Sequence, residues 1–579
     1  MSMIPRLYFL IAFLVLAGCP AMIYGQLRCE AKNDAQAATS LRKSANAGDA
    51  LAMTNMGEMY RCGLGGLTKD DTQAAVWFRK GAEAGSPRAM TSLSYMYASG
   101  LGGLARDEAL AMVWARKAAE AGDAQGMTNL ANLYLAGTGV LAKDDAQAVA
   151  WYRKAADAGN AQAMGNLAYM YHSGRGGLAK DDAQALAWYR KATDAGDGQS
   201  MASLAHMYSL GQGGLPKDDA QAAAWYRKAA DAGNPRGMAG LAAMYSAGQG
   251  GLVKDDAQAL VLFRKAADAG DRVAMANLGI MYENGQGGLA KDDAQAVTWY
   301  RKAAEAGEAQ AMMNLGKMYG FGRGGLAKDD ARALVWYQKA ADAGNPEAMF
   351  YTGAMHQFGQ GGLAKDDAQA VAWYRKAADA GDAIAMNNLA GMYEHGQGGL
   401  AKDDAQVVAL YRKAADAGLR DAMMNLGVMY EHGRNGLAKD DVQAGFWYRK
   451  AADAGDTHAM MNLALMYQSG RGILAKDDAQ AVAWYRKAVD AGDAYALTNL
   501  GLMYASGRGG LPKDEAQAVV LFRKAADAGD AVAMTNLGYM YLIGLGGLTK
   551  DQAQALIWFR KAAELGDERA KHALRQLGR

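Results

Sequence analysis

The side chains that could carry out chemistry are few, and they form no known catalytic arrangement. The chain has seven histidines, and no pair of them has the H-x-x-x-H or H-E-x-x-H spacing of a zinc site. There is no G-x-S-x-G nucleophile elbow, and the glycine-rich loops, such as residues 248–251, lack the G-K-[ST] ending of a phosphate-binding loop. The sequence therefore predicts no catalytic residues, no metal ligands and no cofactor. The histidines are His172, His206, His356, His395, His432, His458 and His572.

Two Glu-His pairs recur at the same place in neighbouring stretches of the chain. Glu394-His395 and Glu431-His432 lie 37 residues apart. Stacked pairs of this kind can bind a metal ion. The same residues are also ordinary solvated side chains at the C-terminal ends of two helices, and we favour that interpretation.

Composition and charge exclude several classes of protein. The chain has 579 residues, and 62 Lys and Arg balance 60 Asp and Glu to a net charge of +2. That balance argues against nucleic acid or another polyanion as a partner bound through bulk charge. An apolar fraction of 51% excludes a chain that is disordered throughout.

The tryptophans show that the chain is built from one repeated unit. Every spacing between them is 37 residues or a multiple of 37, and Leu262, Leu410 and Leu521 occupy the three positions that lack Trp. Fourteen units therefore run from residue 49 to residue 566 without insertion or deletion. A period of this length is typical of a solenoid. The tryptophans are Trp77, Trp114, Trp151, Trp188, Trp225, Trp299, Trp336, Trp373, Trp447, Trp484 and Trp558.

Each unit has the pattern of two helices joined by a loop, as residues 160–196 illustrate. Asn160 is placed to cap the first helix, which we call the A helix, and Gly174 to end it. Asp181 is placed to cap the second, the B helix, and Gly196 to end it. We expect an all-α fold in which stacked hairpins bury each other's apolar stripes. The residues at i, i+3, i+4 and i+7 are Met164, Leu167, Ala168 and Tyr171 in the first helix, and Ala185, Trp188, Tyr189 and Ala192 in the second.

The repeated frame identifies a family resemblance. It reads A-M-x-N-L-G-x-M-Y-x-x-G-x-G-G-L-x-K-D-x-x-Q-A-x-x-W-Y-x-K-A-A-x-x-G and resembles the Sel1-like repeat, a relative of the tetratricopeptide repeat; residues 402–448 illustrate it. The resemblance implies a right-handed α-solenoid superhelix of helix–loop–helix hairpins, with the A helices on the concave side. It also implies a scaffold for protein partners. Exported relatives have been linked to binding host proteins or organising envelope complexes.

The N-terminus predicts export. Residues 1–18 combine a short basic segment with ten apolar residues, Leu7 to Leu16, which is too short to span a membrane but typical of a signal peptide. The sequence Leu16-Ala17-Gly18-Cys19 resembles a bacterial lipobox, which implies cleavage before Cys19 and its lipidation. The alternative is ordinary cleavage near Gly25. We expect a protein of the periplasm or cell envelope whose membrane contact is a lipid anchor on Cys19, followed by a linker over residues 19–30.

Both ends of the repeat array differ from its middle. Residues 31–48 predict a lone B-type helix and residues 567–579 a lone A-type helix, each placed to cap the apolar core. If Cys19 is lipidated or removed, Cys29 and Cys62 remain to form a disulfide that would fasten the N-terminal end. The alternative is two free thiols.

Comparison of the fourteen copies indicates a binding face on the A helices. Three columns of each A helix vary freely, and at 100° per residue they share one face, which we expect to line a groove away from the core. The face carries apolar residues that no core requires, beside a ladder of Asn suited to the backbone of an extended peptide. The alternative is that the asparagine ladder caps neighbouring backbone and the apolar stripe packs against the next A helix. The predicted partner-binding residues are Asn314, Phe350, Asn388, Met424, Asn425, Val428, Met461, Asn462, Leu465, Asn499, Leu502, Asn536 and Tyr539.

The sequence therefore favours a non-enzymatic scaffold for a protein or peptide. Two alternatives stay open. Some cysteine-rich relatives have been credited with binding or hydrolysing β-lactams, but this chain lacks their pair of cysteines per repeat and any pairing of nucleophile and base. A purely structural spacer is the other alternative.

Overall fold

The computed structural model describes residues 35–137, 142–472 and 475–577. In this part of the chain every regular element is an α-helix and no strand occurs. The helices belong to two compact units, one ending at Lys328 and the other beginning at Asp329. The predicted signal peptide at 1–18, Cys19 and the linker at 19–30 lie outside the described residues.

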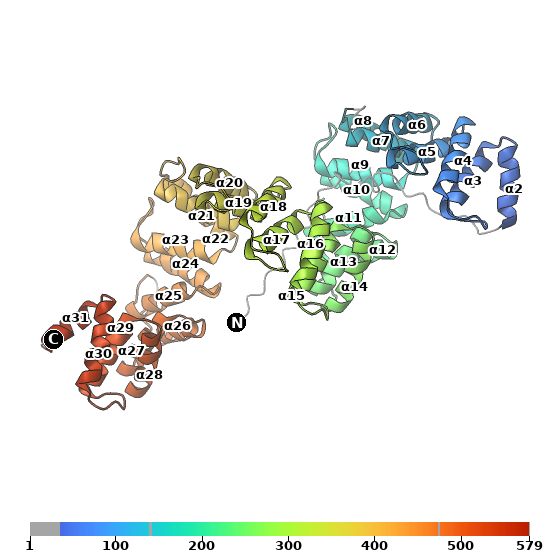
Figure 1. The fold of residues 1–579 in the computed structure, drawn as a ribbon. Helices are drawn as coiled ribbons and strands as arrows, with labels where there is room; N and C mark the ends of the chain where they lie inside the picture. Colours follow the sequence, from blue (N-terminus) through green and yellow to red (C-terminus); the bar gives the residue numbers. More distant parts are fainter. Residues whose placement is uncertain (1–34, 138–141, 473–474, 578–579) are drawn as a thin grey trace. The chain divides into compact units, whose positions relative to one another are not determined.

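Odd-numbered helices from α3 onward are A helices, and even-numbered ones are B helices (Figure 1). Helices α3 to α30 have 13 residues each, α2 has 12 and α31 has 9. The first unit contains α2 (Ala35–Asn46), α3 (Ala50–Cys62), α4 (Asp71–Glu83), α5 (Pro87–Ser99), α6 (Glu108–Glu120), α7 (Ala124–Ala136), α8 (Asp145–Asp157), α9 (Ala161–Ser173), α10 (Asp182–Asp194), α11 (Gly198–Leu210), α12 (Asp219–Asp231), α13 (Pro235–Ala247), α14 (Asp256–Asp268), α15 (Arg272–Asn284), α16 (Asp293–Glu305) and α17 (Ala309–Phe321). The second contains α18 (Asp330–Asp342), α19 (Pro346–Phe358), α20 (Asp367–Asp379), α21 (Ala383–His395), α22 (Asp404–Asp416), α23 (Arg420–His432), α24 (Asp441–Asp453), α25 (Thr457–Ser469), α26 (Asp478–Asp490), α27 (Ala494–Ser506), α28 (Glu515–Asp527), α29 (Ala531–Ile543), α30 (Gln552–Glu564) and α31 (Glu568–Gln576).

The predicted caps fix where these helices begin and end. The Asn160 side chain accepts a hydrogen bond from the Ala163 amide at 2.8 Å and starts α9. Gly174 ends it in the left-handed region, with φ 63°. The Asp181 carboxylate accepts from the Gln184 amide at 2.9 Å and starts α10. The same pattern recurs along the chain, which explains why the repeat holds its phase.

Within each hairpin a large residue of the B helix packs into a small one of the A helix. Tyr448 of α24 is fully buried, and a Cβ placed on Gly427 of α23 would come within 2.5 Å of its ring. A larger residue at 427 would therefore separate the two helices. The predicted core residues Leu167 and Tyr189 are likewise buried.

Most tryptophans lie at the edge of the core rather than inside it. Trp151 is half-buried, and the Lys154 ammonium sits 4.2 Å from its ring centroid. The same stacking of Lys on the preceding Trp recurs in most B helices. A cation over an aromatic face is a favourable contact, and it shields the part of the ring that the core leaves open.

The loop between the two helices contacts the preceding hairpin closely. Gly176 adopts φ 67°, and a Cβ there would lie 2.5 Å from the Asp145 carbonyl oxygen. Glycine is required both by the positive φ and by the lack of space for a Cβ, and it recurs at this position in the other loops. The exception among the described residues is Asn435, with φ 52°, whose side-chain amide donates to Glu394 at 3.3 Å.

Polar contacts join successive hairpins. An arginine of each of most B helices donates to a tyrosine hydroxyl of the next A helix, as Arg449 does to Tyr467 at 2.7 Å. The stacking of hairpins within each unit confirms the predicted all-α solenoid. The right-handed sense of a superhelix stays a prediction.

The described chain begins with α2 and ends with α31, the two helices that we expect to cap the apolar core. Helix α31 packs its Ala570 and Ala573 inward, against α30, and turns Glu568 and Lys571 outward. At the other end, α2 packs against α3. Cys62, at the end of α3, is disulfide-bonded in the structure. Its predicted partner Cys29 lies outside the described residues, so the pairing itself stays a prediction.

Candidate partner-binding surface

The predicted variable face carries a row of exposed apolar residues in the second unit. Six such residues, between 37% and 59% exposed, lie on three successive A helices, α25, α27 and α29. We call them the A-face patch. Exposed apolar side chains gathered in this way are typical of an interaction site. The patch consists of Leu465, Tyr495, Leu502, Val532, Tyr539 and Ile543.

The helices that carry the patch are nearly free of charge. Helices α27 (494–506) and α29 (531–543) contain no acidic or basic residue. The nearest carboxylates, Asp493 and Asp530, are buried and cap these helices by accepting from the amides of Ala496 and Val532. The B helices, in contrast, carry acidic residues in their first turn and Lys in their last. The patch can therefore bury apolar surface without removing a charge from water.

One of the three variable columns consists of positions 313, 350, 387, 424, 461, 498 and 535, and its side chains are buried or partly buried rather than exposed. Met313, Thr498 and Thr535 are buried, where the sequence predicts an exposed position. Thr498 donates to Asp530, the cap of the next A helix, at 2.5 Å. An A helix packs against its own B helix and against both neighbouring repeats. These three contacts leave only a narrow face of the A helix exposed to solvent.

The predicted residues Phe350, Met424, Val428 and Met461 are partly buried and pack against the core of the second unit. The Phe350 ring stacks on Tyr374, with centroids 5.7 Å apart. These four side chains mainly hold hairpins together, which was the alternative that the sequence left open. Leu465, Leu502 and Tyr539 are the predicted apolar residues that are exposed.

The predicted asparagine ladder mostly bonds within the solenoid. Asn425 donates to Asn387 of the preceding A helix at 3.1 Å. Asn314 accepts from Gln310 at 3.2 Å, and Asn388 from Asn387 at 3.5 Å. Near the A-face patch, the atoms that accept hydrogen bonds from these asparagines include methionine sulfur, a weak acceptor.

Beside the patch the asparagine donors are poorly satisfied. Asn462 donates to the Met424 sulfur at 3.9 Å and is also hydrogen-bonded to the Tyr448 side chain. Asn499 donates to the Met461 sulfur at 3.6 Å and to its own helix at the Tyr495 carbonyl, 3.3 Å away. The Asn536 amide nitrogen is buried, with no hydrogen-bond partner among the described residues. A thioether is a weak acceptor, so the Asn499 amide retains bonding capacity.

The two Glu-His pairs do not assemble a metal site. His395 and His432 each bond the carbonyl four residues earlier in their own helices, at 2.8 and 3.0 Å. Burial raises the pKa of Glu431, but hydrogen bonds from Tyr448 and Arg471 outweigh it and leave the pKa below its usual value. In the described part of the chain no group of three His, Cys, Asp or Glu is arranged to hold a metal ion.

The remaining histidines give no catalytic pairing either. His172 contacts Asp182 at 2.6 Å. Burial lowers the pKa of His206 to about 4, which keeps its ring neutral at physiological pH.

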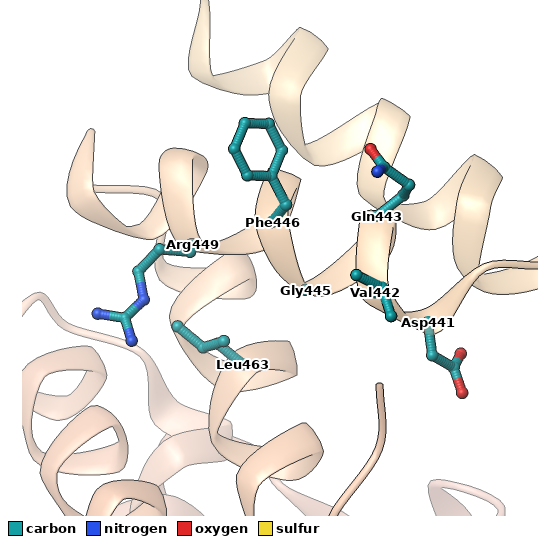
Figure 2. Close-up of a pocket in the computed structure, with 7 residues that line it drawn as sticks. All are labelled: Asp441, Val442, Gln443, Gly445, Phe446, Arg449 and Leu463. Atoms are coloured by element: carbon teal, nitrogen blue, oxygen red, sulfur yellow. The ribbon is translucent and has the colours of Figure 1, made fainter. Parts of the chain in front are cut away.

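A cavity on the B-helix side is a feature that sequence reasoning missed. It has a volume of about 340 Å³ and lies along α24, with Leu463 on the adjoining helix α25 (Figure 2). The signal for it was present in the sequence, since Gly445 and Phe446 differ from their counterparts in the other B helices. The lining residues are Asp441, Val442, Gln443, Gly445, Phe446, Arg449 and Leu463.

Fold and surface together define a helical-repeat solenoid with an exposed, uncharged apolar face. The model of the Sel1 repeat matches this chain in fourteen consecutive segments, from 50–86 to 531–567. The chain belongs to the Sel1 repeat family, whose members are generally scaffolds for protein interaction rather than enzymes.

Two solved structures of Sel1 repeat proteins are similar to this chain. One is a protective antigen present in uropathogenic Escherichia coli strains, with 34% identity over 74% of this chain and 90% of the other, and a TM-score of 0.49. The other is a Sel1 repeat protein from Oxalobacter formigenes, with 30% identity over 55% of this chain and 90% of the other, and a TM-score of 0.41. A search of curated proteins found no match.

None of the helices in the described ranges combines the length and the apolar character needed to cross a membrane.

Proposed function

We propose that this protein is a non-enzymatic scaffold that binds a protein or peptide partner on the A-face patch. The observation that carries the proposal is the row of Leu465, Leu502 and Tyr539 on successive A helices, each exposed and each in a column that varies between repeats. The core does not require Leu465 or Leu502, because the same column holds Gly391 and Ala354 elsewhere in the unit. The exposed Tyr539 ring also packs edge-on against the buried Phe559, with centroids 5.0 Å apart.

The chemistry of the patch favours an uncharged apolar segment as the partner. Removing apolar surface from water contributes roughly 25 cal/mol per Å², and no buried charge opposes it here. Asn499, which donates to sulfur, is placed to donate instead to a backbone carbonyl of an extended chain. Binding is therefore insensitive to salt, in contrast to a charged interface.

We also propose that the protein is exported and tethered to a membrane by lipid on Cys19, in the periplasm or cell envelope. The support is the order of basic, apolar and Leu16-Ala17-Gly18-Cys19 segments at the N-terminus. Mass spectrometry of the mature N-terminus in the source cells tests this. A diacylated Cys19 is the expected result, and an N-terminus beyond residue 19 would contradict it.

Replacement of Leu465 and Leu502 by Asp tests the binding surface. The matched control replaces Val520 and Ile557 by Asp, two residues of similar exposure on B helices of the same unit. Both variants should keep wild-type helicity by circular dichroism, because all four side chains are exposed. The first should lose the partner adducts formed by chemical crosslinking in intact cells, while the control should retain them. Equal loss in both, or in neither, would refute the assignment of the A face.

A further inference from the structure

The fourteen repeats show which residues the fold needs at each position of a B helix, and α24 departs from them at three. Position 442 is Val where twelve other repeats have Ala and one has Thr. Position 445 is Gly where every other repeat has Ala, Val, Leu or Met. Position 446 is Phe, and no other repeat has an aromatic residue there. All three residues line the cavity of Figure 2.

Glycine at 445 removes a side chain that fills space elsewhere. In the hairpin of α26, Val482 points at the second loop glycine of the next repeat, so that a Cβ on Gly509 would lie 2.6 Å from its Cγ2. Four other valines make the same contact. At the equivalent Gly472 no atom of residue 445 is among the nearest neighbours. Gly445, which lacks this side chain, is one of the residues that line the cavity. The four other pairs are Val149–Gly176, Val297–Gly324, Val371–Gly398 and Val519–Gly546.

The rim of the cavity is apolar and open to solvent. Val442 and Phe446 are 41% and 49% exposed. The Phe446 ring is held edge-on against Trp447, with centroids 5.2 Å apart. An exposed aromatic side chain beside a cavity is typical of a contact that a ligand completes.

The charged residues of the lining are engaged elsewhere. Asp441 accepts two bonds from Arg471, at 2.8 and 3.3 Å. Arg449 donates to Tyr467 at 2.7 Å and stacks on Trp484 at 5.0 Å. The Asp441 carboxylate is therefore paired, whereas Arg449 has only neutral partners and the Lys450 ammonium lies 4.7 Å from the centroid of the Phe446 ring. The cavity thus offers no partner for a cationic group, which it would desolvate.

We propose that the cavity at Gly445 receives one uncharged aromatic side chain of a protein partner. The volume of about 340 Å³ exceeds the roughly 150 Å³ of a cavity known to take up benzene, and it lies in the range of small-ligand pockets. Because the exposed Val442 and Phe446 border it, a partner's surface can cover the rim while its ring enters. The site is separate from the A-face patch and does not depend on it.

Ligand-observed NMR on the full-length protein tests the proposal with defined probes. Toluene and indole report on the chemistry of the cavity, N-acetylphenylalaninamide presents the ring on a backbone, and benzoate and benzylammonium carry a charge. The Gly445→Val variant fills the cavity with the residue that α20, α22 and α26 already hold at this position, so it should fold. The Val482→Ile variant is a control for a change of packing in the neighbouring hairpin.

We expect the three uncharged probes to bind the wild type, at least tenfold more weakly to Gly445→Val, and equally to the Val482→Ile control. Circular dichroism verifies that both variants are folded. Absence of binding by any uncharged ring, equal binding by benzylammonium, or unchanged binding to Gly445→Val would overturn the proposal. Binding of toluene without N-acetylphenylalaninamide would also overturn it, because the cavity would then take a free small molecule.

Discussion

Arg471, in the loop after α25, forms a forked ion pair with Asp441, which begins the B helix of the preceding repeat, and its third nitrogen reaches Glu431 of that repeat at 2.7 Å. Arg323 makes the same three contacts with Asp293 and Glu283. A planar guanidinium suits two carboxylates at once. These two repeat interfaces are therefore more polar than those with Gln or Leu at this position of the loop.

Replacement of Arg471 by Gln should lower the free energy of unfolding by about 1–2 kcal/mol, since it removes a forked but partly solvated pair. Urea unfolding followed by circular dichroism measures this. Arg434→Gln is the control, because Arg434 holds the same place one repeat earlier and is exposed. An equal loss in both variants would show that the ion pair contributes nothing specific.

The Arg471 network also predicts a dependence on pH. The pKa of Glu431 lies below its ordinary value of 4.5, so its contribution to stability is present above that pH and is lost as the pH falls through the folded-state pKa. The difference in unfolding midpoint between wild type and Arg471→Gln should therefore shrink as the pH is lowered from 7 to 3. A difference that is constant over this range would contradict the assignment.

For Asp271 we expect the opposite dependence of stability on pH. Burial raises its pKa above the ordinary 3.8, although the amide of Ala274 and the charges of Arg236 and Arg272 act against this. Its contribution to stability is thus present below that pH and is lost as the pH rises through the folded-state pKa. The Asp271→Asn variant retains a capping side chain, because Asn is the residue type that caps α13 and α19. The variant should be more stable than the wild type at pH 7.5 but not at pH 4. Thermal unfolding at the two pH values checks this.

Substitutions at the two adjacent loop glycines before α28 distinguish the cost of a steric clash from the cost of backbone strain. A Cβ on Gly509 would lie 2.4 Å from the Asp478 carbonyl oxygen, whereas one on Gly510 would meet nothing within 4 Å; both have positive φ. Gly510→Ala should cost about 1 kcal/mol and Gly509→Ala at least twice that. Equal losses in urea unfolding would mean that the loop moves away from α26 freely.

The sequence predicted the fold because each helix is specified locally. Asn160 and Asp181 cap the helices that follow them, as expected for these residue types, and equivalent residues recur every 37 positions along the chain. The candidate surface was predicted only in part. Leu465 and Met461 lie on one face by helical geometry, yet one is exposed and the other packs on the next repeat. That difference depends on how hairpins stack, which the periodicity of a single helix does not record.

Site-specific photo-crosslinking from position 502 tests the central claim most directly. A photoreactive phenylalanine derivative replaces Leu502 in the A-face patch, or Val520 on α28 as the control, and adducts are compared after irradiation of intact source cells. We expect a discrete protein adduct from position 502 that is absent from position 520. The same adducts from both positions, or none from position 502, would contradict it.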